Sequence, residues 1–330
     1  MQMERMMQDH SAEDLSRPPR RSGRLRQRAA WMYFVEEMTQ SAIAEALGVG
    51  RVTVVRMLAE AKALGEVRIA LSRGDAELAG LEAALCKVYG LSAAIVAPLS
   101  AAGADPTAPI AAALGDTVSA LLRNDMKIGL GWGRTLNHSL EYLRERSLRR
   151  LHVVSLVGGV TYFAHDNPAE FPSAFARVFN AECYLIPAPA LVDSPATKAA
   201  LIERCGLGAV YDFARTLDAV VVSVGTLSEK ATIGRFHLIG EAERRLMREY
   251  GGVGELLCNV FDNEGRLIDH ALNQRVMSIP LEAVRAAPIR VLAAGGAHKL
   301  AAIEGGIKLL KPTALVTDGA TARRLTGGPR

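Results

Sequence analysis

The sequence lacks any apolar run long enough to cross a membrane and any cysteine pattern typical of a metal or redox site. No stretch approaches the roughly 20 apolar residues that a span needs, and the charged first 28 residues lack the apolar centre of a secretory signal. The cysteines form no CxxC pair and no histidine lies at ligand spacing from them: Cys86, Cys183, Cys205 and Cys258. We therefore expect a cytoplasmic protein with buried free thiols and with neither a metal nor a cofactor.

The chain also lacks a strong excess of charge of one sign. Its net charge is +4 over 330 residues, and most of the excess lies in the first quarter. The arginines that gather there are Arg17, Arg20, Arg21, Arg24, Arg26 and Arg28. Such a segment suits contact with phosphates, although a solvated basic tail has the same composition. We expect residues 1–24 to form a basic flexible tail.

A length of 330 residues, with 49% hydrophobic and 22% charged residues, predicts a globular protein of two domains. Apolar residues at helical spacing predict helices over residues 25–38, 40–47 and 51–63, and "EVRIAL" then alternates like a short strand. "SRGDAE" is the most linker-like point. We expect a helical domain over residues 25–73 and a linker helix over 74–90, whose apolar face suits a core or an oligomer seam.

Beyond residue 90, short β-branched runs alternate with longer segments rich in Ala and Leu. The runs are "SAAIVAP", "KIGLGWG", "LHVVSLVGG", "ECYLIPAP", "DAVVVSVGT", "IRVLAAGG" and "PTALVTDG". Nearly continuous apolar strands, each followed by a helical stretch, are typical of a parallel sheet that is covered on both faces. Residues 91–330 are therefore predicted to form a doubly wound, mostly parallel α/β domain.

The segment "TQSAIAEALGVGRVTVVRMLAEAK" has the spacing of a helix-turn-helix. Ala44 is the small residue over which a second helix can cross, and Gly48 supplies the turn. Gly50 departs from the usual Ser or Asn at the second N-cap. The residues expected to face DNA are Gln40 at the start of the first helix, and Arg51, Val52, Thr53 and Arg56 on the second. A structural helical hairpin is the alternative.

From "WMYFVEEMTQSAIAEALGVGRVTVVRMLAEAKALGEVRIAL" onward, the chain resembles the SorC family of sugar-responsive transcriptional regulators. The resemblance continues through "LEAALCKVYGLSAAIVAP", "IGLGWGRTL", "SLVGGV", "YLIPAPALVD", "GGVGELLCNVFDNEG" and "AGGAHKLAAIEGGI". It implies an N-terminal helix-turn-helix, an effector domain similar to sugar-phosphate isomerases, and a tetramer.

The segment "KIGLGWGRTLNHSLEYL" runs from a strand through a Gly-rich loop into a helix. Backbone N–H groups of Gly131, Gly133, Arg134 and Thr135 could cradle an anion at the start of this helix, and the Arg134 guanidinium could grip it. Tight turns in α/β folds are Gly-rich for steric reasons as well. In the family this loop contacts a sugar phosphate and carries small hydroxyl residues, so Arg134 is a departure.

Further candidates lie after other strands of the expected sheet. Gly158 and Gly225 end strands at the carboxyl edge, where open α/β sheets bind ligands; both could equally be plain turn glycines. The resemblance implies that Glu255 and Lys299 contact the effector, and it places Asn167 and Arg235 in contact regions.

These features predict a DNA-binding regulator of a carbohydrate or polyol catabolic operon. The expected partners are a near-palindromic operator, a sugar, polyol or phosphorylated sugar, and further copies of the chain in a dimer of dimers. Whether effector binding releases a repressor from DNA or activates transcription stays open. The alternative is an enzyme acting on sugar phosphates, because a Glu near a Lys suits general base catalysis.

Overall fold

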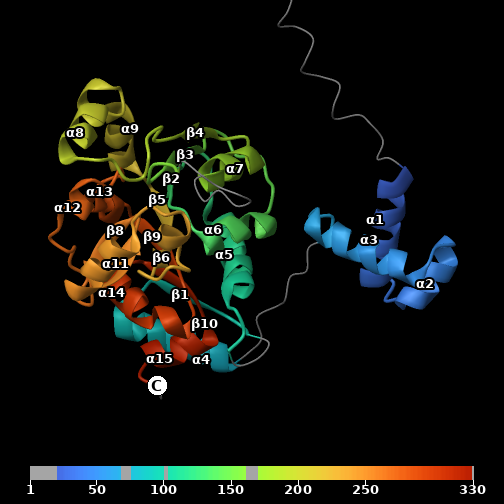
Figure 1. Cartoon of the computed structure of the whole chain (residues 1–330). Coiled ribbons are helices and arrows are strands. Elements are labelled where there is room, and N and C mark those ends of the chain that lie inside the picture. Colours follow the sequence, from blue (N-terminus) through green and yellow to red (C-terminus); the bar gives the residue numbers. More distant parts are fainter. Residues whose placement is uncertain (1–20, 68–75, 100–102, 161–169, 329–330) are drawn as a thin grey trace, which may run out of the picture. The chain divides into compact units, whose positions relative to one another are not determined.

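The computed structural model describes residues 21–67, 76–99, 103–160 and 170–328. The chain divides into two compact units, Met1–Arg73 and Gly74–Arg330 (Figure 1). The expected basic tail up to residue 20, most of the expected strand over residues 66–71 and the candidate Asn167 lie outside the described residues.

Three helices form the N-terminal unit: α1 Arg21–Phe34, α2 Gln40–Leu47 and α3 Arg51–Ala63. Residues 21–24, which we expected in the tail, form the first turn of α1. The helix ends before residue 38, our expected end, and Glu37 has a φ of 54°, which a helix does not allow. The core of this unit is Ala29, Ala30, Met32, Ile43, Ala44, Val54, Leu58 and Ala61.

The turn between α2 and α3 has the geometry that its sequence predicts. Thr39 caps α2 by accepting a hydrogen bond from Ala42 N at 3.2 Å. Gly48 ends α2 with a φ of 64°, a left-handed conformation in which a side chain is strained. Ala44 is buried in the core of the unit. The two helices thus have the bounds predicted from the spacing.

A seven-stranded parallel sheet forms the centre of the C-terminal unit, in the order β1-β10-β9-β5-β2-β3-β4 (Figure 1). Its strands are β1 Ala93–Ala97, β2 Lys127–Leu130, β3 His152–Ser155, β4 Glu182–Tyr184, β5 Ala219–Val222, β9 Ile289–Ala293 and β10 Ala314–Asp318. Each of the seven apolar runs supplies one strand, so the predicted fold class is confirmed.

Helices cover both faces of this sheet. Successive strand residues alternate between two cores, as Val153 packs with α5 Thr107–Leu121 and α7 Phe171–Val178, whereas Val154 lies in the other core. The second core includes residues of α4 Ala76–Tyr89, α14 Leu300–Leu310 and α15 Gly319–Leu325. Leu85 of α4 is fully buried there. The helix that we expected to be a linker is therefore part of the C-terminal unit.

A small antiparallel sheet, β6 Val224–Gly225, β7 Gly252–Leu256 and β8 Asn259–Asp262, adds to the parallel one. The two-residue turn between β7 and β8 holds Leu257 and Cys258 at positive φ. The remaining helices are α6 Arg134–His138, η1 Ser139–Tyr142, α8 Pro195–Arg204, α9 Gly208–Phe213, η3 Ala214–Thr216, α10 Thr232–Arg235, α11 Glu241–Glu249, α12 Ala271–Gln274, α13 Leu281–Ala286 and η4 Ala297–Lys299.

The strand order places a switch point between β2 and β5. From β2 the chain continues outward to β3 and β4, whereas from β5 it continues in the opposite direction to β9 and β10. Open α/β sheets bind ligands at the carboxyl ends of the strands beside such a point. The loops that follow β2, β5 and β9 therefore frame the expected site.

All four cysteines are free. Our expectation that they are buried is confirmed for Cys258 and is wrong for Cys205, which is exposed, whereas Cys86 and Cys183 are half-buried. In the described ranges, no helix is long and apolar enough to span a membrane.

Candidate functional site

The outward face of α3 carries the residues that we expected to meet DNA. Arg51 and Arg56 are exposed, and so is Val52, with 83% of its surface accessible. Arg56 lies 3.9 Å from Glu60 in an exposed ion pair. Thr53 and Gln40, by contrast, are half-buried in the first turns of α3 and α2. The two arginines and Val52 thus form the accessible part of this face.

Arg26, one of the clustered arginines that suit contact with phosphates, has a structural role instead. Its guanidinium donates two hydrogen bonds of 2.7 Å to the carboxylate of Glu66, just beyond α3. These bonds hold the pKa of Glu66 below its ordinary value. Arg26 therefore ties α1 to the end of α3, and this fork is not available to a phosphate.

In the C-terminal unit, the loop after β2 is a turn that needs glycine. Gly133 has a φ of 133° immediately before α6, a region of backbone space that favours glycine. The expected anion cradle must be corrected at Gly131, whose N–H donates to Val221 O at 2.9 Å. That bond continues the pairing of β2 with β5. The N–H groups of Arg134 and Thr135 lie in the first helical turn, where no intrahelical acceptor is available.

Arg134 faces an acid that we did not predict. Its guanidinium lies 3.9 Å from the carboxylate of Asp105. Asp105 accepts hydrogen bonds from Thr107 N at 2.9 Å and from Thr107 Oγ1 at 2.6 Å. These bonds, followed by the charge of Arg134, lower the pKa of Asp105. A fixed carboxylate thus lies beside the candidate anion-binding arginine.

Glu255 is a buried acid of β7, with 5% of its surface exposed. Burial raises its pKa to about 7, against the opposing effects of a hydrogen bond from Cys258 N at 2.9 Å and of the charge on Lys299. Gly225 pairs with Glu255 across the small sheet, and a Cβ at Gly225 would lie 2.1 Å from Glu255 Oε1. The glycine therefore makes room for the carboxylate.

Lys299 ends the short helix η4 after β9. Burial lowers its pKa, and so does the charge of Arg134, whereas Glu255 and Asp105 act in the opposite direction. His298 also belongs to this group, because burial and the charges of Lys299 and Arg134 lower its pKa. Electrostatic interactions thus link a group of charged and titratable side chains at the carboxyl edge of the sheet: Glu255, Asp105, Lys299, Arg134 and His298.

Asp318, at the end of β10, holds the loop that leads to Lys299. It is 1% exposed and accepts hydrogen bonds from Gly296 N at 2.9 Å, Thr321 N at 2.9 Å and Thr321 Oγ1 at 2.6 Å. Gly296 has a φ of 100°, which favours glycine. One buried carboxylate therefore both caps α15 and fixes the position of η4.

An open pocket lies between α6 and α10. It is lined by Gly133, Arg134, Asn137, His138, Thr232, Arg235 and Phe236. Arg134 and Arg235 come from segments about a hundred residues apart, and both residues are exposed. The structure thus brings Arg235 to the same pocket as the loop after β2.

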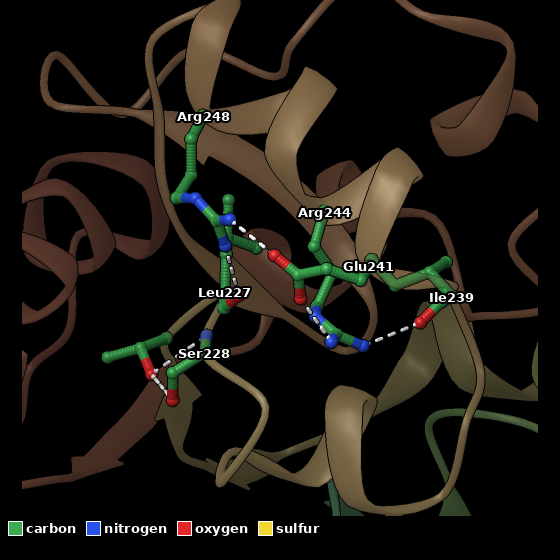
Figure 2. Close-up of polar contacts among 7 residues, drawn as sticks. Leu227, Ser228, Ile239, Glu241, Arg244 and Arg248 are labelled. Carbon is green, nitrogen blue, oxygen red and sulfur yellow. Dashed lines mark hydrogen bonds and ion pairs between the residues drawn. The ribbon is translucent and has the colours of Figure 1, made fainter.

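Figure 2 shows how α11 holds both ends of the segment that carries α10. Arg248 donates to Leu227 O at 2.9 Å and Arg244 donates to Ile239 O at 2.8 Å. Both arginines also bind the carboxylate of Glu241. Because Leu227 and Ile239 flank α10, these bonds help to fix the position from which Arg235 reaches the pocket.

Two of the remaining candidates have side-chain positions that are taken up by packing. Gly158 donates its N–H to Met277 O at 2.8 Å, and a Cβ there would lie 2.5 Å from Ala188 O. Close backbone packing therefore accounts for this glycine. Thr135 is buried within α6, and Asn167 is outside the described residues.

Sequence reasoning missed Asp105 and His298. His298 stood in the quoted motif "AGGAHK", next to a chosen lysine. Asp105 lies in a segment that reads as a loop rich in Ala, Gly and Pro, and its only local signal is the Asp-x-Thr spacing.

Hydroxyl-rich ligands suit this arrangement. Carboxylates accept hydrogen bonds from hydroxyl groups, and guanidinium and ammonium groups donate to hydroxyl or phosphate oxygens. Within the described part of the chain, no group of three or more His, Cys, Asp or Glu side chains could hold a metal ion.

Comparison with known proteins matches residues 76–326 to the family described as "Putative sugar-binding domain". The erythritol catabolism regulatory protein EryD of Brucella abortus is 31% identical over 92% of this chain and 96% of its own length. The deoxyribonucleoside regulator of Bacillus subtilis is 26% identical over 90% and 95%.

Among solved structures, the chain is similar to the full-length sorbitol operon regulator SorC from Klebsiella pneumoniae. The TM-score is 0.72 at 27% identity, and the match covers 92% of this chain and 98% of that one. Both units of the chain therefore have counterparts in a single regulator.

Proposed function

Because the chain belongs to the SorC family of sugar-binding transcriptional regulators, we propose that it binds an operator through α3 and a polyol, sugar or sugar phosphate through its C-terminal unit. Two separate observations carry this proposal: α3 has an exposed basic face, and in the C-terminal unit the buried acid Glu255 lies near the half-buried ammonium group of Lys299 at the sheet switch point. Relatives named for erythritol and sorbitol favour a polyol.

The DNA-binding part rests on the accessible face of α3. Arg51 and Arg56 are exposed there, and the first turn of α3 contains no acidic residue that would repel phosphate. Two such helices in a dimer would lie about 34 Å apart and read a near-palindromic operator.

An anisotropy titration with DNA from upstream of the chain's own operon tests this part. Arg51→Ala and Arg56→Ala should each weaken binding about tenfold, and Lys311→Ala, an exposed cation of the C-terminal unit, should not. Unchanged affinity of both α3 variants would remove α3 as the reading helix.

The effector part rests on Glu255 and Lys299 at the switch point, with Asp105 and Arg134 beside them. Glu255 and Asp105 suit the hydroxyl groups of a polyol, whereas Arg134 and Arg235 suit a phosphate. At the loop after β2, Gly133 has no side chain that would keep a ligand from the backbone N–H groups of Arg134 and Thr135, and a Cβ there would make no close contact with other residues.

A thermal-shift screen tests the effector part with erythritol, sorbitol and their phosphates. A ligand that binds the folded state raises its melting temperature, and Lys299→Ala should abolish the shift. Lys308→Ala is the matched control, because Lys308 pairs with Glu264 on the surface. A shift that survives Lys299→Ala would contradict the assignment.

Effector binding can alter DNA affinity only if it favours one arrangement of the subunits. We propose a dimer of dimers acting in the cytoplasm as an effector-responsive repressor, in which the ligand changes the spacing of the two α3 helices. Size-exclusion chromatography with light scattering, with and without ligand, measures the assembly.

A catalytic role is the second candidate, and the pKa of Glu255 near 7 favours it, because such a group suits acid–base chemistry at neutral pH. The relatives are named as regulators, so we propose binding without turnover. Product formation from the ligand found in the screen, without DNA binding, would reverse this choice.

A further inference from the structure

Val52 is an exposed apolar residue of the N-terminal unit whose position folding does not explain. Its exposed fraction of 83% is the largest among the described large apolar side chains that are exposed. Val52 lies two residues before Val54, which faces the core. Two residues correspond to a rotation of about 200° around the axis of α3, so the Val52 side chain points away from the core. Valine is also a weaker helix former than alanine. Neither burial nor helix propensity accounts for a valine at this position.

The charged side chains nearest to Val52 along α3 are cationic. Arg51 is adjacent, and Arg56 lies one helical turn further on, with 72% of its side chain exposed. A second copy of α3 covering Val52 would bring two pairs of arginines together, and like charges repel. The face instead suits a partner that presents negative charge around a small apolar group.

The major groove of DNA has this pattern. Phosphates border the groove, and thymine is the base that presents a methyl group in it. We infer that Val52 reads thymine, packing its two methyl groups against the C5-methyl of the base while Arg51 and Arg56 lie beside the phosphates or neighbouring bases. This inference rests on the proposed DNA-binding function. In a dimer the same contact occurs in both half-sites, so the operator carries a thymine at the equivalent place in each.

Replacing thymine by deoxyuridine tests the contact, because only the methyl group is removed and the pairing edge is kept. The full chain is titrated with the duplex that it protects upstream of its own operon, after each thymine is replaced in turn. We expect one position in each half-site where the change weakens wild-type binding about fourfold, which corresponds to about 0.8 kcal/mol for one buried methyl group. Changing both half-sites should weaken binding about 16-fold.

Val52→Ala completes a double-mutant cycle. It should weaken binding to the thymine duplex, and replacing the same thymine should then have no further effect, because the partner of the methyl group is already gone. Val35→Ala makes the same side-chain change at another exposed valine of this unit, with an exposed fraction of 55%. It should keep the full sensitivity to thymine. Circular dichroism of Val52→Ala should show unchanged helix content.

The possible outcomes distinguish a failure of the thymine contact from a failure of DNA binding. If the wild type binds DNA but no deoxyuridine position distinguishes it from Val52→Ala, the thymine contact is overturned and DNA binding stands. If the wild type binds none of the upstream DNA, both fall together.

Discussion

The two units of the chain place their candidate functional groups differently. In the N-terminal unit, Arg51 and Val52 are exposed on a helix whose other face forms the core. In the C-terminal unit, Glu255 and Asp318 are 5% and 1% exposed and hold backbone N–H groups of neighbouring turns. The candidate recognition groups of the first unit are therefore nearly separate from its core, whereas in the second unit a candidate such as Glu255 also holds the backbone of a turn.

Asp318→Ala is the change for which we expect the largest effect, because Asp318 is a buried side chain that holds the backbone of the C-terminal unit. The change removes a helix cap and leaves the Thr321 N–H, and in part that of Gly296, without its acceptor. We expect the free energy of unfolding of the C-terminal unit to fall by about 3 kcal/mol. Urea unfolding measures it in a Trp31→Phe background, where the buried Trp132 reports on this unit alone.

Asp116→Ala is the matched control for that measurement. Asp116 pairs with Arg144 on the surface, so its loss should lower the free energy of unfolding by less than about 1 kcal/mol. If Asp116→Ala and Asp318→Ala lower the free energy of unfolding equally, the buried carboxylate of Asp318 does not stabilise the C-terminal unit more than a surface ion pair does.

Glu255 should make the stability of the C-terminal unit depend on pH. The unfolded chain releases this proton near the ordinary value of 4.5, whereas the folded chain keeps it until about pH 7. The folded state therefore binds more protons in this window, and its stability falls as pH rises through it. Between pH 5 and pH 8, the wild type should lose about 2 kcal/mol of unfolding free energy relative to Glu255→Gln.

Urea unfolding of both proteins at four pH values between 5 and 8 measures this difference. Glu264→Gln, at an exposed acid that pairs with Lys308, should follow the wild-type curve. If Glu255→Gln also runs parallel to the wild type, the buried carboxylate is not the source of the pH dependence.

The contrast between the units also explains which parts of the fold were predictable. The bounds of α2 and α3 followed from local spacing and from Gly48, because these helices meet within a short stretch of chain. The strands of the parallel sheet followed from their apolar runs, because both of their faces are buried. The small sheet was missed, because β6 contains only Val224 and Gly225 and pairs with residues of β7 that lie 32 and 30 positions further along the chain.

The site was less predictable than the fold. Glu255 and Lys299 came from family resemblance, because nothing local to them indicates burial or a shared edge. Asp105 reaches Arg134 only through the tertiary arrangement, so its loop carried no signal of the contact. The N–H of Gly131 was assigned to an anion, but sheet pairing uses it, and a sequence motif does not show how far a ladder extends.

The smallest expected effect concerns the two N-caps of the helix-turn-helix. Thr39 caps α2 with its side chain, whereas Gly50 begins α3 without a side-chain cap. Gly50 has φ −72° and ψ 148°, which serine also adopts, and a Cβ there would lie 3.9 Å from Thr53 Oγ1. Gly50→Ser should therefore stabilise the start of α3 by a few tenths of a kcal/mol.

When hydrogen exchange is measured in the full chain, the backbone amides of α3 should exchange more slowly in Gly50→Ser, by less than about twofold. The amides of α2, whose cap is unchanged, serve as the internal control. The affinity for the operator should stay the same, because the exposed side chains that we propose to meet DNA are untouched. Faster exchange in α3 would show that Gly50 is needed for steric reasons, and a change in affinity would show that recognition and folding are coupled in this unit as well.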